Sequence, residues 1–259
     1  IVNYYTRNAP EKPNPQKKKE PITLDPMNFQ VAEYVTPNDL IAGVTSIKIH
    51  PTKPEVWVGM RTHQTIILDK NLKAGKQIPT RSANVSTQFV GARTFLTGIG
   101  KMYPNDQKLG TMYELVGNNP SIILDSLKRP VDLQVADLNE DGIADYVICE
   151  YGFEQGQLIW VDGKTREKQV LKMQAGARNV VIRDFTGEGK PDIMVLTAQS
   201  REGVSLFINK GKGTFIEKPL LQFDAVFGSS YMEVTDMNKD GHADIIVSNG
   251  DNADYSFSK

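Results

Sequence analysis

Cysteine is nearly absent from this chain. The 259 residues include one cysteine, Cys149, so no disulfide can form within the chain. Cys149 follows the apolar residues Val147 and Ile148, and no histidine or basic residue lies near it in the sequence to activate the thiol. We therefore expect Cys149 to be a small buried side chain of a strand rather than a nucleophile.

Histidine is also scarce, and familiar catalytic motifs are missing. The three histidines, His50, His63 and His242, are far apart, and the sequence has no G-x-S-x-G, no H-E-x-x-H and no zinc-spaced set of Cys and His. These absences exclude the common serine hydrolases and zinc enzymes. His63 with Arg61 could still act as an acid–base pair, although a hydrated surface histidine is the commoner role for such a residue.

The chain lacks an excess of charge and lacks long apolar runs. Lys and Arg number 30 against 31 Asp and Glu, which gives a net charge of -1. No strong positive field exists for nucleic acid or an anionic membrane, and no apolar run is long enough to span a bilayer. We expect neither a nucleic-acid partner nor a membrane span. The sequence begins at Ile1 and cannot show whether a signal peptide was removed.

What the chain does have is a repeated acidic loop. The pattern D-x-N-x-D-G-x-x-D occurs at 137–145 and 236–244, with a degenerate copy at 184–192. The first aspartates of the three copies are 47 and then 52 residues apart. A short acidic loop that recurs at this interval predicts an array of similar structural units with an ion in each loop.

Each full copy offers oxygen donors at alternate positions of a tight turn. Side chains at the first, third, fifth and ninth positions and the carbonyl at the seventh can converge on one point, and the glycine at the sixth permits the turn. Such hard donors favour calcium over zinc or copper. The predicted ligands are Asp137, Asn139, Asp141, the Ile143 carbonyl and Asp145, then Asp236, Asn238, Asp240, the His242 carbonyl and Asp244.

The loop differs from an EF-hand, and an ion-free turn is its alternative interpretation. An EF-hand has glutamate at its twelfth position and helical flanks, whereas these loops have Ile148 or Val247 there and strand-like flanks. A single Asn/Asp/Gly turn often binds nothing, but two full copies in one context favour metal. In the middle copy Thr186 and Glu188 replace Asn and Asp, and Gly187 is expected to loosen the loop, so a weaker site is predicted.

The chain divides into an N-terminal segment and a series of short strands. Residues 1–40 carry closely spaced prolines and three consecutive lysines, which favour an extended linker. From residue 41 the predicted units are 42–85, 86–130, 131–178, 179–228 and 229–259. The third should hold strands at 131–137, 145–150, 157–162 and 167–173, and the fourth at 179–184, 192–197, 203–209 and 214–222. The first two units have ordinary turns in place of the acidic loop. The fifth stops after about two strands and would expose an edge, so we expect that the chain is a fragment, that some residues were not seen, or that the terminal strands close the ring.

The acidic loops and the N-x-G-x-G-x-F turn at 209–215 resemble FG-GAP/VCBS repeats, the blades of integrin-α-like β-propellers. The resemblance is strong over 131–259. The N-G-D-N-A-D-Y stretch at 249–255 and the I-V-N-Y-Y start are similar to secreted bacterial members. The resemblance implies an all-β propeller of four-stranded antiparallel blades, with structural Ca²⁺ in loops between strands 1 and 2. It also implies a further ligand set, Asp184, Thr186, Glu188, the Lys190 carbonyl and Asp192.

In such a propeller the face opposite the calcium loops is the expected place for a ligand. Polar residues of the other loops should gather there around the central channel, although loop tips are often merely hydrated. The candidates are Arg61, His63, Asn105, Asp106, Glu150, Tyr151, Arg178, Asn249, Asp251, Asn252 and Asp254. Asp251 and Asp254 in particular could hold a sugar hydroxyl or a second cation.

Taken together, the sequence predicts a calcium-binding propeller module that recognises carbohydrate or another surface protein. Loops of this type bind calcium at extracellular concentrations, which favours a periplasmic or extracellular location. Two alternatives stay open because fold does not settle function. One is a carbohydrate-active enzyme of lyase or dehydratase type on a propeller scaffold, and the other is a structural spacer in a larger surface protein.

Overall fold

The computed structural model describes residues 2–5, 43–225 and 227–250. These residues form strands and turns, and among them no helix is long and apolar enough to cross a bilayer. Of the predicted N-terminal segment 1–40, only 2–5 fall within the described residues, as β1 (Val2–Tyr5). The predicted ligand residues Asp251, Asn252 and Asp254 lie outside them.

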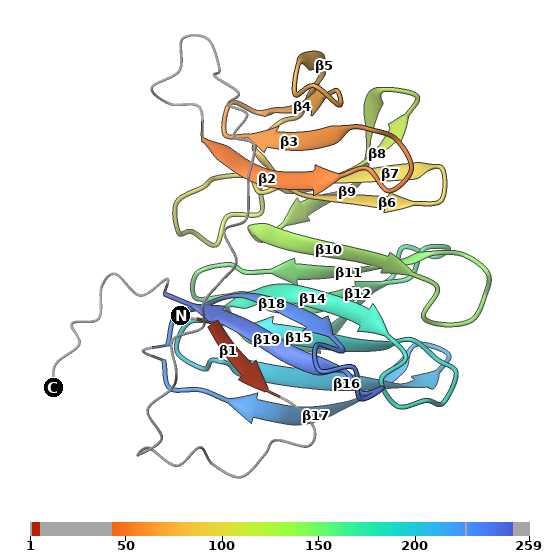
Figure 1. Cartoon of the computed structure of the whole chain (residues 1–259), viewed down its shortest axis with the longest axis vertical. Helices are drawn as coiled ribbons and strands as arrows, with labels where there is room; N and C mark the ends of the chain where they lie inside the picture. The colour runs from red at the N-terminus through yellow and green to blue at the C-terminus, as the bar shows by residue number, and fades with distance from the viewer. Residues whose placement is uncertain (1, 6–42, 226, 251–259) are drawn as a thin grey trace, which may run out of the picture.

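Four successive units each form a four-stranded antiparallel sheet whose strands pair in chain order. Figure 1 shows these sheets following one another along the molecule. The strands of the first two are β2 (Val44–Ile49), β3 (Val56–Met60), β4 (Gln64–Leu68) and β5 (Ala74–Pro79), then β6 (Asn84–Val90), β7 (Arg93–Gly98), β8 (Gly110–Val116) and β9 (Asn119–Leu127). Those of the next two are β10 (Pro130–Ala136), β11 (Asp145–Glu150), β12 (Gln157–Val161) and β13 (Lys168–Lys172), then β14 (Ala177–Arg183), β15 (Asp192–Thr197), β16 (Gly203–Gly211) and β17 (Thr214–Gln222).

The fifth sheet takes its third strand from the other end of the chain. It has the order β1, β19 (Asp244–Asn249), β18 (Ser229–Thr235), and β1 runs antiparallel to β19 with Val2 opposite Ser248. The expectation that terminal strands join the last unit is therefore confirmed for one strand. The described part of this sheet has three strands where the others have four.

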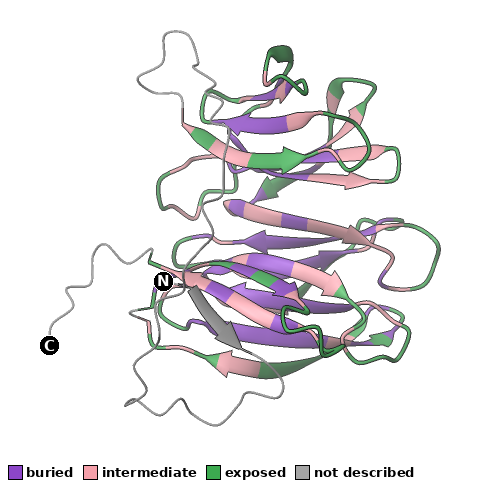
Figure 2. Cartoon of the chain, in the orientation of Figure 1, coloured by how far each residue is buried: buried purple, intermediate pink, exposed green. Residues whose placement is uncertain are grey.

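Each sheet packs on the next as a blade packs in a propeller. The first strands β2, β6, β10, β14 and β18 contact their successors in turn. All six residues of β11 and of β15 are buried, whereas β13 and β17 are largely exposed (Figure 2). A second strand is covered on both faces by neighbouring blades, which explains the apolar run at the centre of each of these strands.

Side chains of neighbouring blades meet in separate apolar clusters. Phe95 and Tyr146 join the second and third blades, with ring centroids 5.8 Å apart. Trp160 and Phe215 join the third and fourth, at 5.9 Å. Cys149 is fully buried in the latter cluster, and burial raises the pKa of its thiol, so the expectation of a core cysteine is confirmed.

A β-bulge recurs at the same place in every first strand. The register against the second strand shifts in each blade two residues after the pairing begins. The residues that follow the shift are Ser46, Ser86, Asp132, Asn179 and Tyr231. Because a bulge bends its strand and re-aims the side chains next to it, this repetition places equivalent polar residues in successive blades.

Three of these residues form a hydrogen-bond relay across four blades. Ser86 Oγ donates to Asp132 Oδ1 (3.1 Å) and Asn179 Nδ2 donates to Asp132 Oδ2 (2.8 Å). The Met232 amide of the next blade then donates to Asn179 Oδ1 (3.2 Å). Burial raises the pKa of Asp132, and the hydrogen bonds from Val180, Asn179 and their neighbours oppose that rise. The relay therefore links the first strands of four successive blades.

Close packing at Gly213 provides a test of how the third and fourth blades fit together. Gly213 lies in the turn between β16 and β17 with φ of 72°, and a Cβ there would lie 2.5 Å from the Trp160 ring. Gly187 has a similar φ of 75° but no atom within 4 Å of such a Cβ. We expect Gly187→Ala to lower the free energy of unfolding by about 1 kcal/mol from the left-handed backbone alone. Gly213→Ala should lower it by about 3 kcal/mol because overpacking adds to that cost. Equal losses in urea denaturation would contradict this packing.

Candidate metal loops and a cavity at the channel mouth

The three acidic loops share one backbone path, and each joins the first strand of a blade to its second. They lie together on the right-hand side of Figure 1. At the fourth position φ is 66° in Glu140, 61° in Lys239 and 75° in Gly187. Left-handed backbone suits glycine and strains other residues. Glycine at position 187 therefore fits the conformation that all three loops adopt, whereas Glu140 and Lys239 are strained there.

Side-chain oxygens of each loop point toward the loop's own amides. Asp137 Oδ1 accepts from Glu140 N (2.8 Å), and its Oδ2 accepts from Gly142 N (2.9 Å). Asn139 and Asp141 accept from amides two residues further on. Asp236, Asn238 and Asp240 repeat this pattern. Backbone amides thus hold the oxygens of the first, third and fifth positions on the inner side of the turn.

Two of the aspartates at the ninth position, Asp145 and Asp192, use their two carboxylate oxygens to join the acidic loop to another part of the same blade. We call this pair of contacts the clasp. Asp145, Asp192 and Asp244 are each 0% exposed. Asp145 Oδ2 accepts from Leu138 N (3.0 Å), and its Oδ1 accepts from Gly163 N (2.8 Å), in the turn between β12 and β13. Burial raises the pKa of Asp145, and these two amides oppose the rise. The carboxylate thereby ties the acidic loop to the third strand of the same blade.

Asp192 makes the same clasp with more partners. It accepts from Phe185 N (3.0 Å), Thr186 N (3.1 Å) and Asn209 N (2.8 Å), and the Thr186 hydroxyl also donates to it (3.1 Å). In the third loop Asp244 accepts from the equivalent amide, Met237 N (2.9 Å). The bond to the loop is therefore common to all three aspartates, and the bond to the third-strand side of the blade is seen for Asp145 and Asp192.

The first, third and fifth positions of the loop suit calcium, both because their donors are oxygens and because the loop turns these oxygens toward its inner side. These supply carboxylate and amide oxygens, and each oxygen has a second lone pair beyond the amide that it accepts. Among the described residues, no three His, Cys, Asp or Glu side chains are gathered as a metal cluster. The ninth-position carboxylates, turned into the clasp, would need to share their oxygens between amides and an ion.

The middle loop differs in its fifth position. Glu188 forms an ion pair with Lys210, whose Nζ lies 3.0 Å from Oε1 and 3.1 Å from Oε2 of the glutamate. The first-position carboxylate still accepts amides from Gly187 and Gly189, and those hydrogen bonds hold the pKa of Asp184 below its ordinary value. An ion at this loop would compete with the ammonium group of Lys210 for Glu188.

The predicted ligand residues of the opposite face do not form one group. Arg61 and His63 are exposed on the turn between β3 and β4. Asn105 bonds within its own loop. Asp106 accepts the amides of 153, 154 and 155, which ties the second blade to the third. Desolvation by burial raises the pKa of Asp106, but the hydrogen bonds from the three amides outweigh it, so the pKa lies below its ordinary value.

Glu150 is also engaged within the protein. It is 3% exposed and accepts from Lys128 N (2.7 Å) and Gln157 Nε2 (2.5 Å). These bonds fasten the connection between the second and third blades. Glu150 therefore lies in a structural contact rather than with the residues that line a cavity. Asn249 ends β19 in the fifth sheet.

Arg178 and Tyr151 do line a cavity. It lies where the first strands of the blades begin, opposite the acidic loops, and this place is called the channel mouth. It has a volume of about 300 Å³, and its other lining residues are Val44, Thr45, Val85, Ile99, Met102, Arg129 and Val131. Thr45, Val85, Val131 and Arg178 are the bulge residues of four successive first strands. The sequence interpretation missed Arg129, although its place just before the first strand of a blade was a usable signal.

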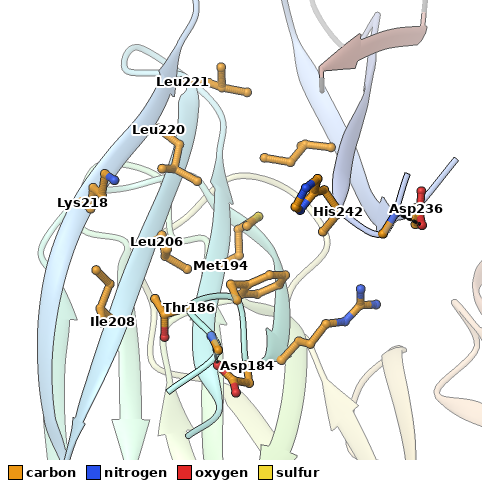
Figure 3. Close-up of a pocket in the computed structure, with 16 residues that line it drawn as sticks. Asp184, Thr186, Met194, Leu206, Ile208, Lys218, Leu220, Leu221, Asp236 and His242 are labelled. Carbon is orange, nitrogen blue, oxygen red and sulfur yellow. Dashed lines mark hydrogen bonds between the residues drawn. The ribbon is translucent and has the colours of Figure 1, made fainter. Parts of the chain in front are cut away.

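A larger cavity of about 770 Å³ lies between the fourth and fifth blades. Figure 3 shows Met194, Leu206 and Leu220 on its wall, with Asp184, Asp236 and His242 at the side of the acidic loops. The wall belongs to β15, β16 and β17 of the fourth blade. The described part of the fifth sheet has three strands, so among the described residues part of this wall is left uncovered.

Comparison with solved structures gives the following similarities. The chain is similar to Kuenenia stuttgartiensis hydrazine synthase, with 15% identity and a TM-score of 0.54 over 78% of this chain and 56% of that one. It is also similar to the computationally designed Ika8 protein, with 11% identity and a TM-score of 0.50 over 78% and 57%. The Cps50 (Swd1) β-propeller domain of Myceliophteria thermophila follows, with 9% identity and a TM-score of 0.47 over 74% and 59%. The chain spans less than 60% of the length of each. A comparison with curated proteins gave no match.

Among the described residues, five sheets of antiparallel strands, each packed on the next through its first strand, define an all-β propeller. Residues 184–247 match the model of the FG-GAP-like repeat, and this range runs from the middle acidic loop through the third. The chain is thus a β-propeller with an FG-GAP-like repeat over residues 184–247, as the motifs predicted.

Proposed function

We propose that this propeller is a secreted, calcium-stabilised recognition module that binds a carbohydrate or protein ligand at its channel mouth. Ca²⁺ would be held by the oxygens of Asp137, Asn139 and Asp141 and of Asp236, Asn238 and Asp240, and more weakly by the middle loop. In each loop the ion would neutralise the carboxylates and cross-link the residues of the turn. The loops themselves lie on the far face from the ligand cavity, so the ion supports the fold rather than contacting the ligand.

The observation that carries this proposal is the cavity formed by the bulge residues. Four blades each contribute the same structural position to it, and the two flanking connections add Arg129 and Tyr151. A small concave site with a few polar groups is the usual form of a ligand site. Arg61 and His63 do not line this cavity, so no observation here favours acid–base catalysis by that pair.

A cavity-filling variant tests the proposal. Val85 lines the cavity, and Val85→Phe would occupy it. Val116 is 68% exposed at the end of β8 and does not line the cavity, so Val116→Phe provides the matched control. The full chain should retain specific glycans or protein ligands on an array, and Val85→Phe should weaken that binding about tenfold or more by occlusion. Val116→Phe should bind as the wild type does. Undiminished binding by Val85→Phe would contradict a ligand site at this cavity. If the wild type binds no ligand on the array, the protein is better explained as a structural spacer.

A further inference from the structure

The cavity at the channel mouth contains two arginines from different blades. Arg129 comes from the connection that enters the third blade, and Arg178 is the bulge residue of the fourth. The remaining lining is largely apolar, with Thr45 and the ring of Tyr151 as the other polar members. Among the described residues, two guanidinium groups and no carboxylate line this small concavity, in a protein whose net charge is -1.

Arg129 is held in place by both of the blades that it joins. Its Nη1 donates to the Gly152 carbonyl (3.1 Å), and its Nη2 donates to the Met102 carbonyl (3.0 Å). The guanidinium carbon lies 5.2 Å from the centroid of the Tyr151 ring. The residue keeps a left-handed backbone, with φ of 48°, which costs about 1 kcal/mol for a side chain of this kind. The surrounding contacts thus fix a charged group at the wall.

Arg178 presents its charge differently. Its side chain is half-buried at the cavity, and among the described residues it donates no hydrogen bond and forms no ion pair. An arginine has five N–H donors in a planar fork. The carboxylates adjacent in sequence to the lining are already engaged. Asp132 accepts from Ser86, Asn179 and two amides, and Glu150 from Lys128 and Gln157.

We infer that this cavity binds an anionic group of the ligand, a carboxylate or a phosphate, with Arg178 as its hydrogen-bonding partner and Arg129 as the fixed charge behind it. Planar N–H pairs match the paired oxygens of these groups, and charge-assisted hydrogen bonds are the stronger kind. The inference rests on the proposed recognition function and adds the chemical class of the ligand. A volume of about 300 Å³ suits a small acid or one acidic unit of a larger ligand.

The test uses small anions with the full chain. Succinate and inorganic phosphate are titrated in calorimetry at low salt, with glucose as the neutral probe. We expect one of the two anions to bind and glucose not to bind, and the affinity to fall with added salt because partly exposed charges are screened. Arg178→Gln should weaken anion binding about tenfold or more, and Arg178→Lys by less because the charge remains. Arg61→Gln, an exposed arginine on the same face, should leave it unchanged.

The outcomes separate the two proposals. Succinate or phosphate binding that is equally strong in Arg178→Gln, or absent from the wild type, overturns the anionic assignment. If an array ligand is still lost in Val85→Phe in that case, recognition at the channel mouth stands and only the ligand class is wrong. Thermal melting of each variant checks that it is folded, and an Arg178→Gln variant that melts as the wild type does makes loss of binding specific to the site.

Discussion

Addition of 10 mM calcium is expected to raise the melting temperature of the full chain by about 8 °C, and a chelator should reverse the change. An ion that binds only the folded state stabilises it by mass action. If extracellular-type loops bind with a Kd of about 1 mM, each full loop contributes about 1.4 kcal/mol at that concentration, and the two together contribute about 3 kcal/mol. Differential scanning calorimetry with and without calcium measures the shift.

Variants of the two full loops assign that shift to particular ions. Asp141 and Asp240 are exposed and each accepts an amide two residues further on, so truncation costs little in the absence of calcium. Asp141→Ala and Asp240→Ala should each remove about half of the calcium-dependent rise. Glu188→Ala should remove less, because Glu188 pairs with Lys210. Absence of any rise in the wild type at millimolar calcium would refute the calcium assignment.

Asp192→Ala is expected to lower the free energy of unfolding by about 4 kcal/mol even without calcium. The substitution leaves three backbone amides and the Thr186 hydroxyl without their acceptor, and the Asn209 amide among them is buried. Buried donors that lose their partners cost about 1–3 kcal/mol each, and removal of a buried carboxylate offsets part of the total. Asp145→Ala, which releases two amides, should cost about 3 kcal/mol by the same mechanism.

Two controls separate the clasp from the ion. Asp192→Asn keeps one acceptor oxygen, so its free energy of unfolding should lie between those of the wild type and Asp192→Ala. Glu188→Ala, in the same loop, removes a surface ion pair and should cost about 0.5 kcal/mol. Urea denaturation in chelator gives all values. If Asp192→Ala destabilises the protein only when calcium is present, then the carboxylate acts as a ligand and its amide contacts contribute little.

Much of the fold could be predicted from local patterns. The predicted strands at 145–150, 192–197 and 214–222 match β11, β15 and β17 as the structure has them. Short apolar runs between acidic turns specify strands on both sides, and a recurring unit needs no long-range information to be recognised. The glycine cluster around Gly211 and Gly213 was correctly interpreted as a hairpin turn between β16 and β17.

The roles of single carboxylates could not be predicted in this way. Asp137 and Asp145 are equivalent in the motif, yet one faces the loop amides and the other is buried against Gly163, which is distant in the sequence. Asp106 and Glu150 have the composition of a ligand site but fasten one blade to the next. Each of these assignments depends on which backbone amides the fold brings near, and sequence spacing does not contain that information.

The sequence by itself determined the repeat, the strands and the acidic loops of this protein, because these depend on turn chemistry and on alternation over a few residues. Tertiary structure alone decided how β1 joins β19 and which side chains reach the channel mouth. Arg129 and Arg178 lie 49 residues apart in the chain and become neighbours at one cavity because consecutive blades place the start of each first strand around a common axis. That convergence is a property of blade packing, and it is where the proposed ligand site arises.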